Sequence, residues 1–303
     1  MVETNLNKKP LISIIINCRN GEKYLKKSVS SVLNQTYNNW EIIFFDNNSS
    51  DKSHKIIKSF KEKRIRYIKS KKFIKLYKAR NLAIKKAKGE YISFLDVDDW
   101  WLKNKLKDQV KYLNENKNVD ILYSNIFLFY EKKRKKEIYC KTKLHSGNIT
   151  QNLLDDFKMS ILSTMIRKNI FKNMKFNDTY DIIGDFDFFI RISILKKIFA
   201  IQKPLACYRI HGSNLSIKKT DINIIELEKW IKDSIKIKRY KNFNFDKMFE
   251  LLNILKIKNF IIKNKKFEAF KMILERPYFF SKFKFIIFFI MPKKLFTRYL
   301  NWF

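Results

Sequence analysis

The sequence predicts an α/β fold with a mostly parallel sheet and helices on both faces, followed by a helical, basic C-terminal appendage. Three observations predict it. Short apolar runs alternate with helical patterns over residues 11–110. Polar residues gather where three of these apolar runs end. After residue 216 the pattern changes to amphipathic helices rich in lysine.

The first hundred residues read as strands and helices in turn. Strands are predicted where apolar, β-branched residues run together, at 11–17, 41–45, 64–68 and 91–95. Helices are predicted where apolar residues recur every three or four positions, at 23–34, 52–60 and 75–87. Such alternation implies parallel strands with right-handed crossovers, so the polar residues after the strands meet at one edge of the sheet. They lie at 17–20, 46–48 and 96–99.

Longer, more aromatic strands follow in the next hundred residues. We expect strands at 120–130 and 137–139, joined by a basic turn, then a helix at 149–157 and a strand at 163–167. Beyond Ser216 the expected helices are 221–240, 246–262 and 265–274.

The acidic turn after the strand at 91–95 is the strongest chemical signal. Asp96, Asp98 and Asp99 lie within four residues, where they repel one another unless a cation sits among them. Oxygen ligands in a D-x-D spacing suit Mg²⁺ or Mn²⁺. The structural alternative is a solvated acidic turn in which Asp99 caps a helix that begins near Trp100.

The composition excludes some classes of protein. The net charge of +36 and pI near 10 favour contact with polyanions, although the abundance of Lys, Asn, Ile and Phe points in part to coding bias. Three cysteines without a C-x-x-C pair argue for a reducing cytoplasm and against zinc or disulfides. No signal peptide is expected, and the longest apolar run, 285–291, is too short to span a membrane.

Several short motifs occur in a fixed order over the first hundred residues. They are IIINCRN (14–20), SVLNQTY (31–37), WEII (40–43), DNNSSD (46–51), ARN (79–81), KGEYI (88–92) and DVDD (96–99). In this order and spacing they resemble the opening of family 2 glycosyltransferases of the GT-A fold, a Rossmann-like fold. The resemblance implies a catalytic domain at 1–216, with a nucleotide-binding half at 10–110 and an acceptor half at 111–216. The appendage is then 217–303.

The resemblance also implies roles for the residues at the strand ends. Asp46 would read the nucleotide base, typically uracil, because a carboxylate accepts from an imide N–H; the alternative is a turn-former. Arg80 would lie near the nucleotide; the alternative is a salt bridge on a helix surface. Asp98 would bind Mn²⁺ or Mg²⁺ under the diphosphate, with Asp96 beside it toward the sugar or ribose. The other residues expected at the nucleotide are Asn17, Arg19, Asn20 and Asn48.

The stretch IGDFDFFIR (183–191) matches a place where the family usually has Glu-Asp, with the Asp as catalytic base. Asp185 keeps the base, and Gly184 replaces the Glu, which leaves open whether activity is lowered. Asp185 lies at a helix start, where the dipole stabilises a carboxylate by roughly 0.3–1 kcal/mol. A plain N-cap is the alternative for Asp185, and Asp187 and then Asp181 are the next candidate bases.

The segment YRIHGSNLS (208–216) resembles the family's late segment, in which the His completes the metal or diphosphate site. His211 is therefore the third candidate metal ligand. A lone His is more often structural, and imidazole suits Mn²⁺ better than Mg²⁺.

The final stretch, 277–303, interleaves basic and aromatic residues. It suits the headgroup region of an anionic membrane; the alternative is packing on the catalytic domain. The expected protein is a cytoplasmic, inverting, metal-dependent transferase at the inner face of the plasma membrane. It would pass sugar from a UDP-sugar to a glycan or lipid-linked acceptor, as in bacterial lipopolysaccharide or capsule assembly. The rivals are a nucleic-acid-binding basic protein and a catalytically weakened scaffold of the same fold; we expect no nucleic-acid partner.

Overall fold

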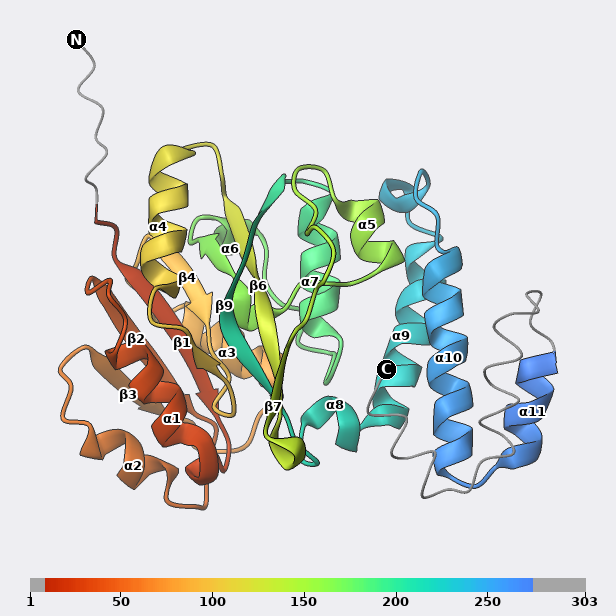
Figure 1. The fold of residues 1–303 in the computed structure, drawn as a ribbon, viewed down its shortest axis with the longest axis horizontal. Helices are drawn as coiled ribbons and strands as arrows, with labels where there is room; N and C mark the ends of the chain where they lie inside the picture. The colour runs from red at the N-terminus through yellow and green to blue at the C-terminus, as the bar shows by residue number, and fades with distance from the viewer. Residues whose placement is uncertain (1–8, 275–303) are drawn as a thin grey trace, which may run out of the picture. The chain divides into compact units, whose positions relative to one another are not determined.

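The computed structural model describes residues 9–274, and the chain divides into two compact units, 1–214 and 215–303 (Figure 1). The predicted basic and aromatic stretch at 277–303 lies outside the described residues. The first unit is α/β and the described part of the second is helical, so the predicted fold class is confirmed.

Within the described residues, the first unit is built on a nine-stranded sheet of order β3-β2-β1-β4-β8-β6-β9-β5, with β7 paired to β6. Strands β1 to β4 pair in parallel, as do β6 and β9, while β8 joins β4 and β6 antiparallel. The strands are β1 (Ile12–Cys18), β2 (Trp40–Asp46), β3 (Ile65–Lys69), β4 (Tyr91–Phe94), β5 (Trp100–Trp101), β6 (Ile121–Tyr130), β7 (Lys135–Ile138), β8 (Met165–Arg167) and β9 (Ile198–Ile210).

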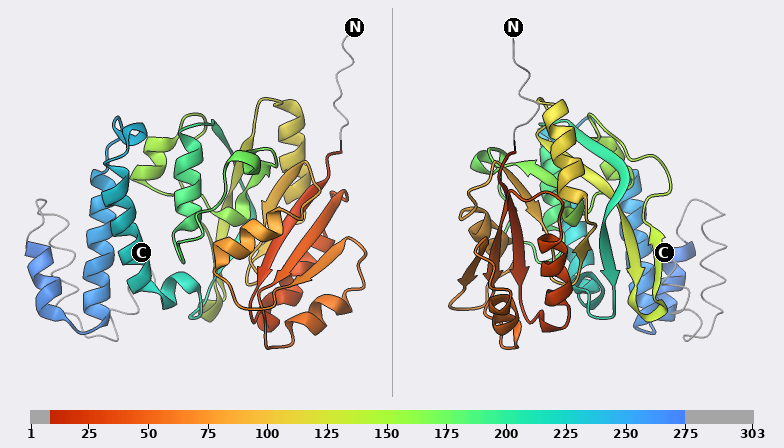
Figure 2. Two further views of the ribbon diagram at one scale, coloured as in Figure 1. Left: turned by 180° about the vertical axis from the view of Figure 1, so that it is seen from behind. Right: turned by 60° about the vertical axis from the view of Figure 1, so that its left-hand side comes forward.

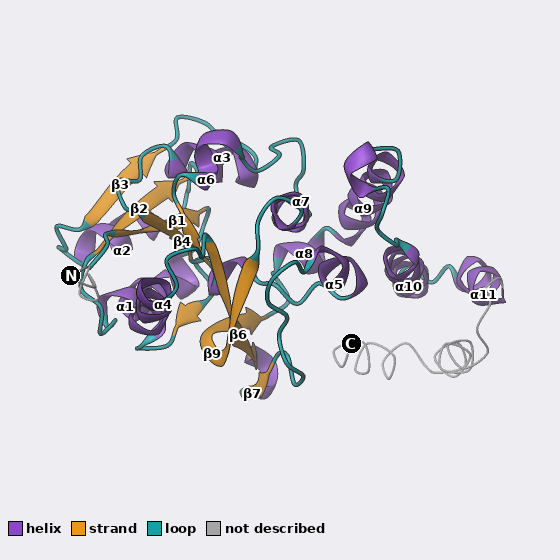
Figure 3. Ribbon diagram, turned by 90° about the horizontal axis from the view of Figure 1, so that it is seen from above, coloured by secondary structure: helices purple, strands orange, loops and turns teal. Residues whose placement is uncertain are grey.

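Helices cover both faces of this sheet. Helices α1 and α4 lie on one side of the parallel strands, and α3 and α6 lie on the other (Figure 3). From behind, α3 crosses in front of the strands β1 and β2, which it contacts (Figure 2). The helices are α1 (Glu22–Leu33), α2 (Ser53–Ser59), α3 (Leu76–Ile84), α4 (Lys105–Glu115), α5 (Thr150–Asp155), α6 (Ile170–Asn173) and α7 (Gly184–Ser193), with 3-10 turns at Glu131–Lys133 and Ile161–Ser163.

The core forms where the apolar runs of the sequence predict it. Ile14 and Ile42 have no exposed surface, because their strands are covered on both faces. Gly89, just before β4, packs so closely on β1 that a Cβ there would lie 2.6 Å from the Leu11 carbonyl oxygen. The KGEYI motif thus has a glycine because two backbones meet there.

The second unit packs its helices side by side. Trp230, Tyr240 and Phe245 form an aromatic cluster, and Ile257 on one helix packs against Ala269 on the next. Along the described part of the chain, no helix is both long and apolar enough to cross a membrane. The elements are α8 (Leu215–Lys218), α9 (Thr220–Ser234), a 3-10 turn at Lys238–Tyr240, α10 (Asp246–Ile262) and α11 (Lys266–Leu274).

One local prediction is wrong, and one strand is missed. Trp100 and Trp101 form the short strand β5, and α4 begins only at Lys105, so Asp99 caps no helix. The long strand β9 was not predicted, because Pro204 and exposed polar residues interrupt its apolar pattern. The ladder between β6 and β9 shifts register beside Pro204, which removes the need for a backbone donor there.

Candidate active site

The acidic turn follows β4 at the carboxyl edge of the sheet. Strand β4 is fully buried and Leu95 continues the burial, but the side chains that follow reach solvent. The side chain of Asp96 is 36% exposed and that of Asp98 is 23% exposed. Asp99 turns inward, and its backbone N–H donates to the Asp96 carbonyl at 3.1 Å. Two of the three acids are therefore open to a ligand.

A buried guanidinium joins this turn to the candidate base. Arg80 on α3 is 2% exposed, with Nη2 3.1 Å from Asp96 Oδ1 and Nη1 3.8 Å from Asp185 Oδ1. A buried charge needs such partners to offset the loss of water. Three predicted site residues from separate parts of the sequence are thus brought together. The surface salt bridge considered for Arg80 is not what the structure has.

Burial sets the electrostatics of the turn. Partial burial raises the pKa of Asp96 to about 6; the Arg80 guanidinium opposes this rise, and the charges of Asp98 and Asp185 add to it. Burial also raises the pKa of Asp99 well above its usual range. Removal of the Asp99 side chain from water therefore favours its protonated form.

Asp185 is the second residue of α7 rather than its cap. The helix is preceded by Ile183, and no side-chain hydrogen bond caps it. Asp185 Oδ1 instead accepts a hydrogen bond from the Tyr77 hydroxyl. The runner-up base, Asp187, is 5% exposed and bonded to Arg191 Nε at 2.8 Å.

Asp181, the third candidate, pairs with Lys75 at 3.2 Å. Asp185 is therefore the acid of this group that shares the guanidinium with the acidic turn.

His211 lies against the acidic turn, as the late motif predicts. Its Nε2 is 3.0 Å from Asp98 Oδ2, and its Nδ1 is 3.2 Å from the backbone N of Ser213. A backbone N–H can only donate, so Nδ1 accepts and the proton of the neutral ring lies on Nε2. In this arrangement His211 donates to Asp98 and orients it. Ligation of a metal by Nε2 would need the Ser213 bond to break.

Arg209 lies in the stretch YRIHGSNLS, and the sequence motif assigns it no role. Its backbone N–H donates to Asp99 Oδ1 at 2.7 Å, and its Nε donates to the Asp98 carbonyl at 2.8 Å. A further contact joins it to Glu131 at 3.4 Å. The end of β9 is thereby fastened to the acidic turn. Its position two residues before His211 was the signal available in the sequence.

Asp46 at the end of β2 is fully buried. Its Oδ1 accepts from the Ser49 backbone N–H at 2.8 Å, which makes it a turn-former. Its Oδ2 accepts from the Tyr67 hydroxyl at 2.7 Å. Asn48 follows with φ of 59°, in the left-handed region that Asn tolerates. If Asp46 recognises the nucleotide base, it must accept from that base with the carboxylate lone pairs that these two hydrogen bonds leave free.

The loop after β1 packs against the same turn. Asn20 has φ of 53°, and its Oδ1 accepts from the Ser50 backbone N–H at 2.9 Å. The guanidinium of Arg19 stacks 3.9 Å from the centre of the exposed Phe73 ring. Asn17 Nδ2 is buried and has no hydrogen-bond partner among the described residues. A buried donor of this kind is explained if a ligand completes the site.

The residues fit a divalent ion held jointly with a ligand. Nowhere in residues 9–274 do three His, Cys, Asp or Glu side chains meet in a metal cluster. The turn offers two accessible carboxylates, Asp96 and Asp98. Mg²⁺ and Mn²⁺ are commonly bound by one or two carboxylates together with waters and substrate phosphates. Two carboxylates are therefore a suitable protein share of such a site.

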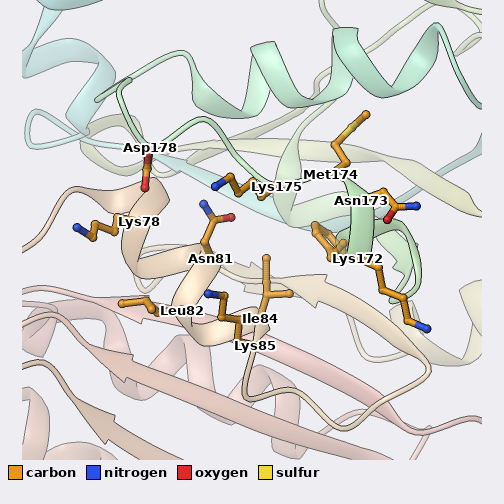
Figure 4. Close-up of a pocket in the computed structure, with 11 residues that line it drawn as sticks. Lys78, Asn81, Leu82, Ile84, Lys85, Lys172, Asn173, Met174, Lys175 and Asp178 are labelled. Atoms are coloured by element: carbon orange, nitrogen blue, oxygen red, sulfur yellow. The ribbon is translucent and has the colours of Figure 1, made fainter.

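A cavity of about 480 Å³ lies on the outward side of α3 (Figure 4). None of the predicted site residues lines it. Its lysines come from α3 and from the segment around α6. They are Lys78, Lys85, Lys172 and Lys175. Helix α3 thus carries Arg80 inward and basic side chains outward.

Comparison with known sequences gives a family. The profile of Glycosyl transferase family 2 matches residues 13–196. The chain is 33% identical over 207 residues to an uncharacterised glycosyltransferase, MJ1057, of Methanocaldococcus jannaschii, covering 67% of this chain and 71% of that protein. It is 32% identical over 213 residues to the Escherichia coli UDP-Glc:alpha-D-GlcNAc-diphosphoundecaprenol beta-1,3-glucosyltransferase WfgD, covering 69% of this chain and 81% of that protein.

Solved structures share the fold at lower identity. S. aureus TarS 1–349 in complex with UDP-GlcNAc matches with a TM-score of 0.63 and 16% identity, over 82% of this chain and 72% of that one. The mannosyltransferase PcManGT from Pyrobaculum calidifontis, in complex with GDP-Man and Mn²⁺, matches with a TM-score of 0.59 and 14% identity, over 82% of this chain and 71% of that one. At these identities the likeness establishes the fold alone.

Proposed function

The chain belongs to glycosyl transferase family 2, and from this premise we propose that it is an inverting, metal-dependent glycosyltransferase. It moves a sugar from a nucleotide sugar to a hydroxyl of a glycan or lipid-linked acceptor. The observation that carries the proposal is the guanidinium of Arg80, which holds Asp96 of the acidic turn and Asp185 of α7 on either side. A donor diphosphate and an acceptor hydroxyl would thus meet within one small group of charges.

The donor we propose is a UDP-sugar, with UDP-glucose as the first to test. WfgD, whose name gives UDP-Glc as donor, is similar over 69% of this chain. The nucleotide would lie along the carboxyl edge of β1, β2 and β4. Asn17, Arg19, Asn20, Asp46, Asn48, Arg80 and Asp96 would contact it.

We assign Mn²⁺ or Mg²⁺ to Asp98 and Asp96. When bound, the ion neutralises the negative charge of the departing diphosphate. His211 acts here by holding Asp98 through its Nε2–H, and it becomes a ligand only if its bond to Ser213 breaks. The two carboxylates, with their partly exposed side chains, support this assignment.

Asp185 is the proposed catalytic base. It takes the proton of the acceptor hydroxyl while that oxygen bonds to the anomeric carbon and the bond to the diphosphate oxygen breaks. Attack from the face opposite the leaving group inverts the sugar configuration. The start of α7 and the Arg80 guanidinium both place partial or full positive charge beside this carboxylate.

The C-terminal region is proposed to contact an anionic membrane that carries the acceptor. The stretch 277–303, outside the described residues, supplies basic and aromatic residues for this purpose. Truncation before Pro277 should reduce co-sedimentation with anionic liposomes at low salt. Unchanged co-sedimentation would remove the tail from this role.

A donor panel tests the proposed function. Purified protein is incubated with UDP-, GDP- and other nucleotide sugars, with and without Mn²⁺, and release of the free nucleotide is measured. We expect release from at least one UDP-sugar, dependent on the metal and absent from Asp185→Asn. Stable metal-dependent UDP binding without release from any donor would favour the catalytically weakened scaffold. Competition by UDP against single-stranded RNA in a filter assay addresses the nucleic-acid alternative.

A further inference from the structure

Gly184 makes room for the ring of Tyr77. A Cβ at position 184 would lie 2.5 Å from Cδ2 and Cε2 of that ring, so any other residue would push the ring away. Tyr77 is 2% exposed and stacks on Phe176 with ring centres 5.9 Å apart. Position 184 therefore has no side chain where the family usually has Glu, because the ring of Tyr77 on α3 fills that space.

The hydroxyl of Tyr77 contacts two groups at the start of α7. One is Asp185 Oδ1, a residue 108 positions away in the sequence. The other is the Ile182 carbonyl oxygen at 2.6 Å. A phenol has one proton to donate, and a carbonyl oxygen can only accept. The two contacts therefore compete for one proton, and the charge on Asp185 decides between them.

The ionised carboxylate is the better acceptor, because hydrogen bonds to charged groups are about twice as strong as neutral ones. When Asp185 is ionised, the Tyr77 proton points to Oδ1. Once Asp185 has taken the acceptor's proton, the Tyr77 proton can turn to the Ile182 carbonyl, so the buried hydroxyl is satisfied in both states. Both Tyr77 and Arg80 approach Oδ1, which leaves Oδ2 for the acceptor hydroxyl.

We infer that Tyr77 is a positioning residue that fixes Asp185 and takes over the support lost with the Glu at position 184. The inference rests on the proposed base role of Asp185. The charged groups that face Asp185 are Arg80 from α3 and, through that guanidinium, Asp96 of the acidic turn. Tyr77 is the neutral donor among them.

Tyr77→Phe removes the hydroxyl and keeps the ring against Gly184. We expect kcat to fall by about 10–100-fold, with KM for the donor changed less than about twofold. In the plot of kcat against pH, the acid limb should move up by about one pH unit, because the ionised Asp185 has lost the hydrogen-bond donor of Tyr77. Tyr67→Phe is the matched control, since it removes a hydroxyl bonded to Asp46. We expect it to raise the donor KM and leave the acid limb in place.

A thermal double-mutant cycle tests the contact without activity. At pH 7, Tyr77→Phe should lower the melting temperature by roughly 3–8 °C in the wild-type background and by less in Asp185→Asn. Equal losses in both backgrounds would overturn the inference, as would unchanged kcat and acid limb in Tyr77→Phe. Loss of UDP binding in Tyr77→Phe would also overturn it, since the residue would then act on the fold. A wild-type protein that releases nucleotide from no donor, yet shows the coupling, would instead defeat the proposed function.

Discussion

The two sides of helix α3 show how differently charge is used in this protein. On the inner side Arg80 is 2% exposed and lies between Asp96 and Asp185. On the outer side Lys78 and Lys85 are exposed and line a cavity with lysines from the segment around α6 (Figure 4). None of these lysines forms an ion pair with a residue at 9–274.

The comparison teaches that the placement of charge, rather than its total, points to function. With a net charge of +36, the chain has many more cations than acids to pair them with, and exposed lysines contribute little to the free energy of unfolding. A buried guanidinium with two carboxylates is costly unless each partner is in place. The inner side of α3 should therefore be sensitive to substitution, and the outer side tolerant.

The largest effect is expected at Asp185. Asp185→Asn should reduce kcat by about 10²–10⁴-fold, because the amide cannot take the acceptor's proton. Calorimetry with UDP and Mn²⁺ should show nearly unchanged affinity. Asp187→Asn is the control: it breaks the bond to Arg191 and should cost stability while kcat stays within about tenfold. The reverse pattern would transfer the base to Asp187.

Asp98→Ala tests the acidic turn itself. Removing this carboxylate should weaken metal-dependent binding of UDP by about 10–100-fold, while binding without Mn²⁺ stays as weak as in the wild type. Titration calorimetry with and without Mn²⁺ measures both. Asp108→Ala, which removes an acid paired with Lys203 on the surface, should change neither. Full metal-dependent affinity in Asp98→Ala would move the cation elsewhere.

Arg80→Met sharpens the comparison by leaving two carboxylates without their shared cation. We expect the free energy of unfolding to fall by about 3–5 kcal/mol, measured by urea denaturation. The exposed Arg66→Met, which loses a bond to the Lys86 carbonyl, should cost less than about 0.5 kcal/mol. Equal losses would show that burial of the guanidinium makes no difference.

Lys105 on α4 extends the comparison to a buried amine with neutral partners. Its Nζ donates to Gln109 Oε1 at 2.7 Å and lies 4.0 Å from the centre of the Trp101 ring. Burial lowers the pKa of Lys105 well below its usual value. At a pH between the two pKa values, Lys105 is protonated in the unfolded chain and neutral in the folded protein. The contribution of Lys105 to the free energy of unfolding is therefore fully present above the unfolded pKa and is lost as pH falls.

We therefore expect the unfolding free energy of the wild type to rise relative to Lys105→Met between pH 7 and pH 9. Denaturation at several pH values measures the difference. Lys107→Met, at an exposed position of the same helix, should show no such trend. A difference that stays constant with pH would mean that Lys105 is charged in the folded protein.

The smallest effect is expected on the outer side of α3. The double substitution Lys78→Gln with Lys85→Gln should change the unfolding free energy by less than about 0.5 kcal/mol and leave kcat unchanged. Thermal melts and the donor assay measure both. A tenfold loss of kcat would break the comparison, because the outer cavity would then take part in the reaction.

The local signals of the sequence predicted most of the first unit. Strands β1, β2 and β4 are apolar runs, and the residues at the ends of β1 and β2 meet, since the Asn47 backbone N–H donates to the Cys18 carbonyl at 2.7 Å. Strand β9 was missed, because its partner β6 and not its own pattern holds it.

Contacts between distant residues were beyond the same reasoning. The contact of Tyr77 with Gly184 joins two helices through the absence of a side chain, which no periodicity records. The bonds of Arg209 to Asp98 and Asp99 use one backbone N–H and one backbone carbonyl, and a motif says nothing about these groups.

The bonds between the acidic turn and the residues after β9 also have a structural consequence. Arg209 is hydrogen-bonded to Asp99, and His211 is hydrogen-bonded to Asp98. The Asn214 side chain accepts a hydrogen bond from the His211 backbone N–H at 2.6 Å. Asn214 is also the last residue of the first unit, so the chain passes to the second unit directly from this group of hydrogen-bonded residues. The hydrogen bonds that orient the Asp98 carboxylate therefore extend, through His211, to the residue at which the first unit ends.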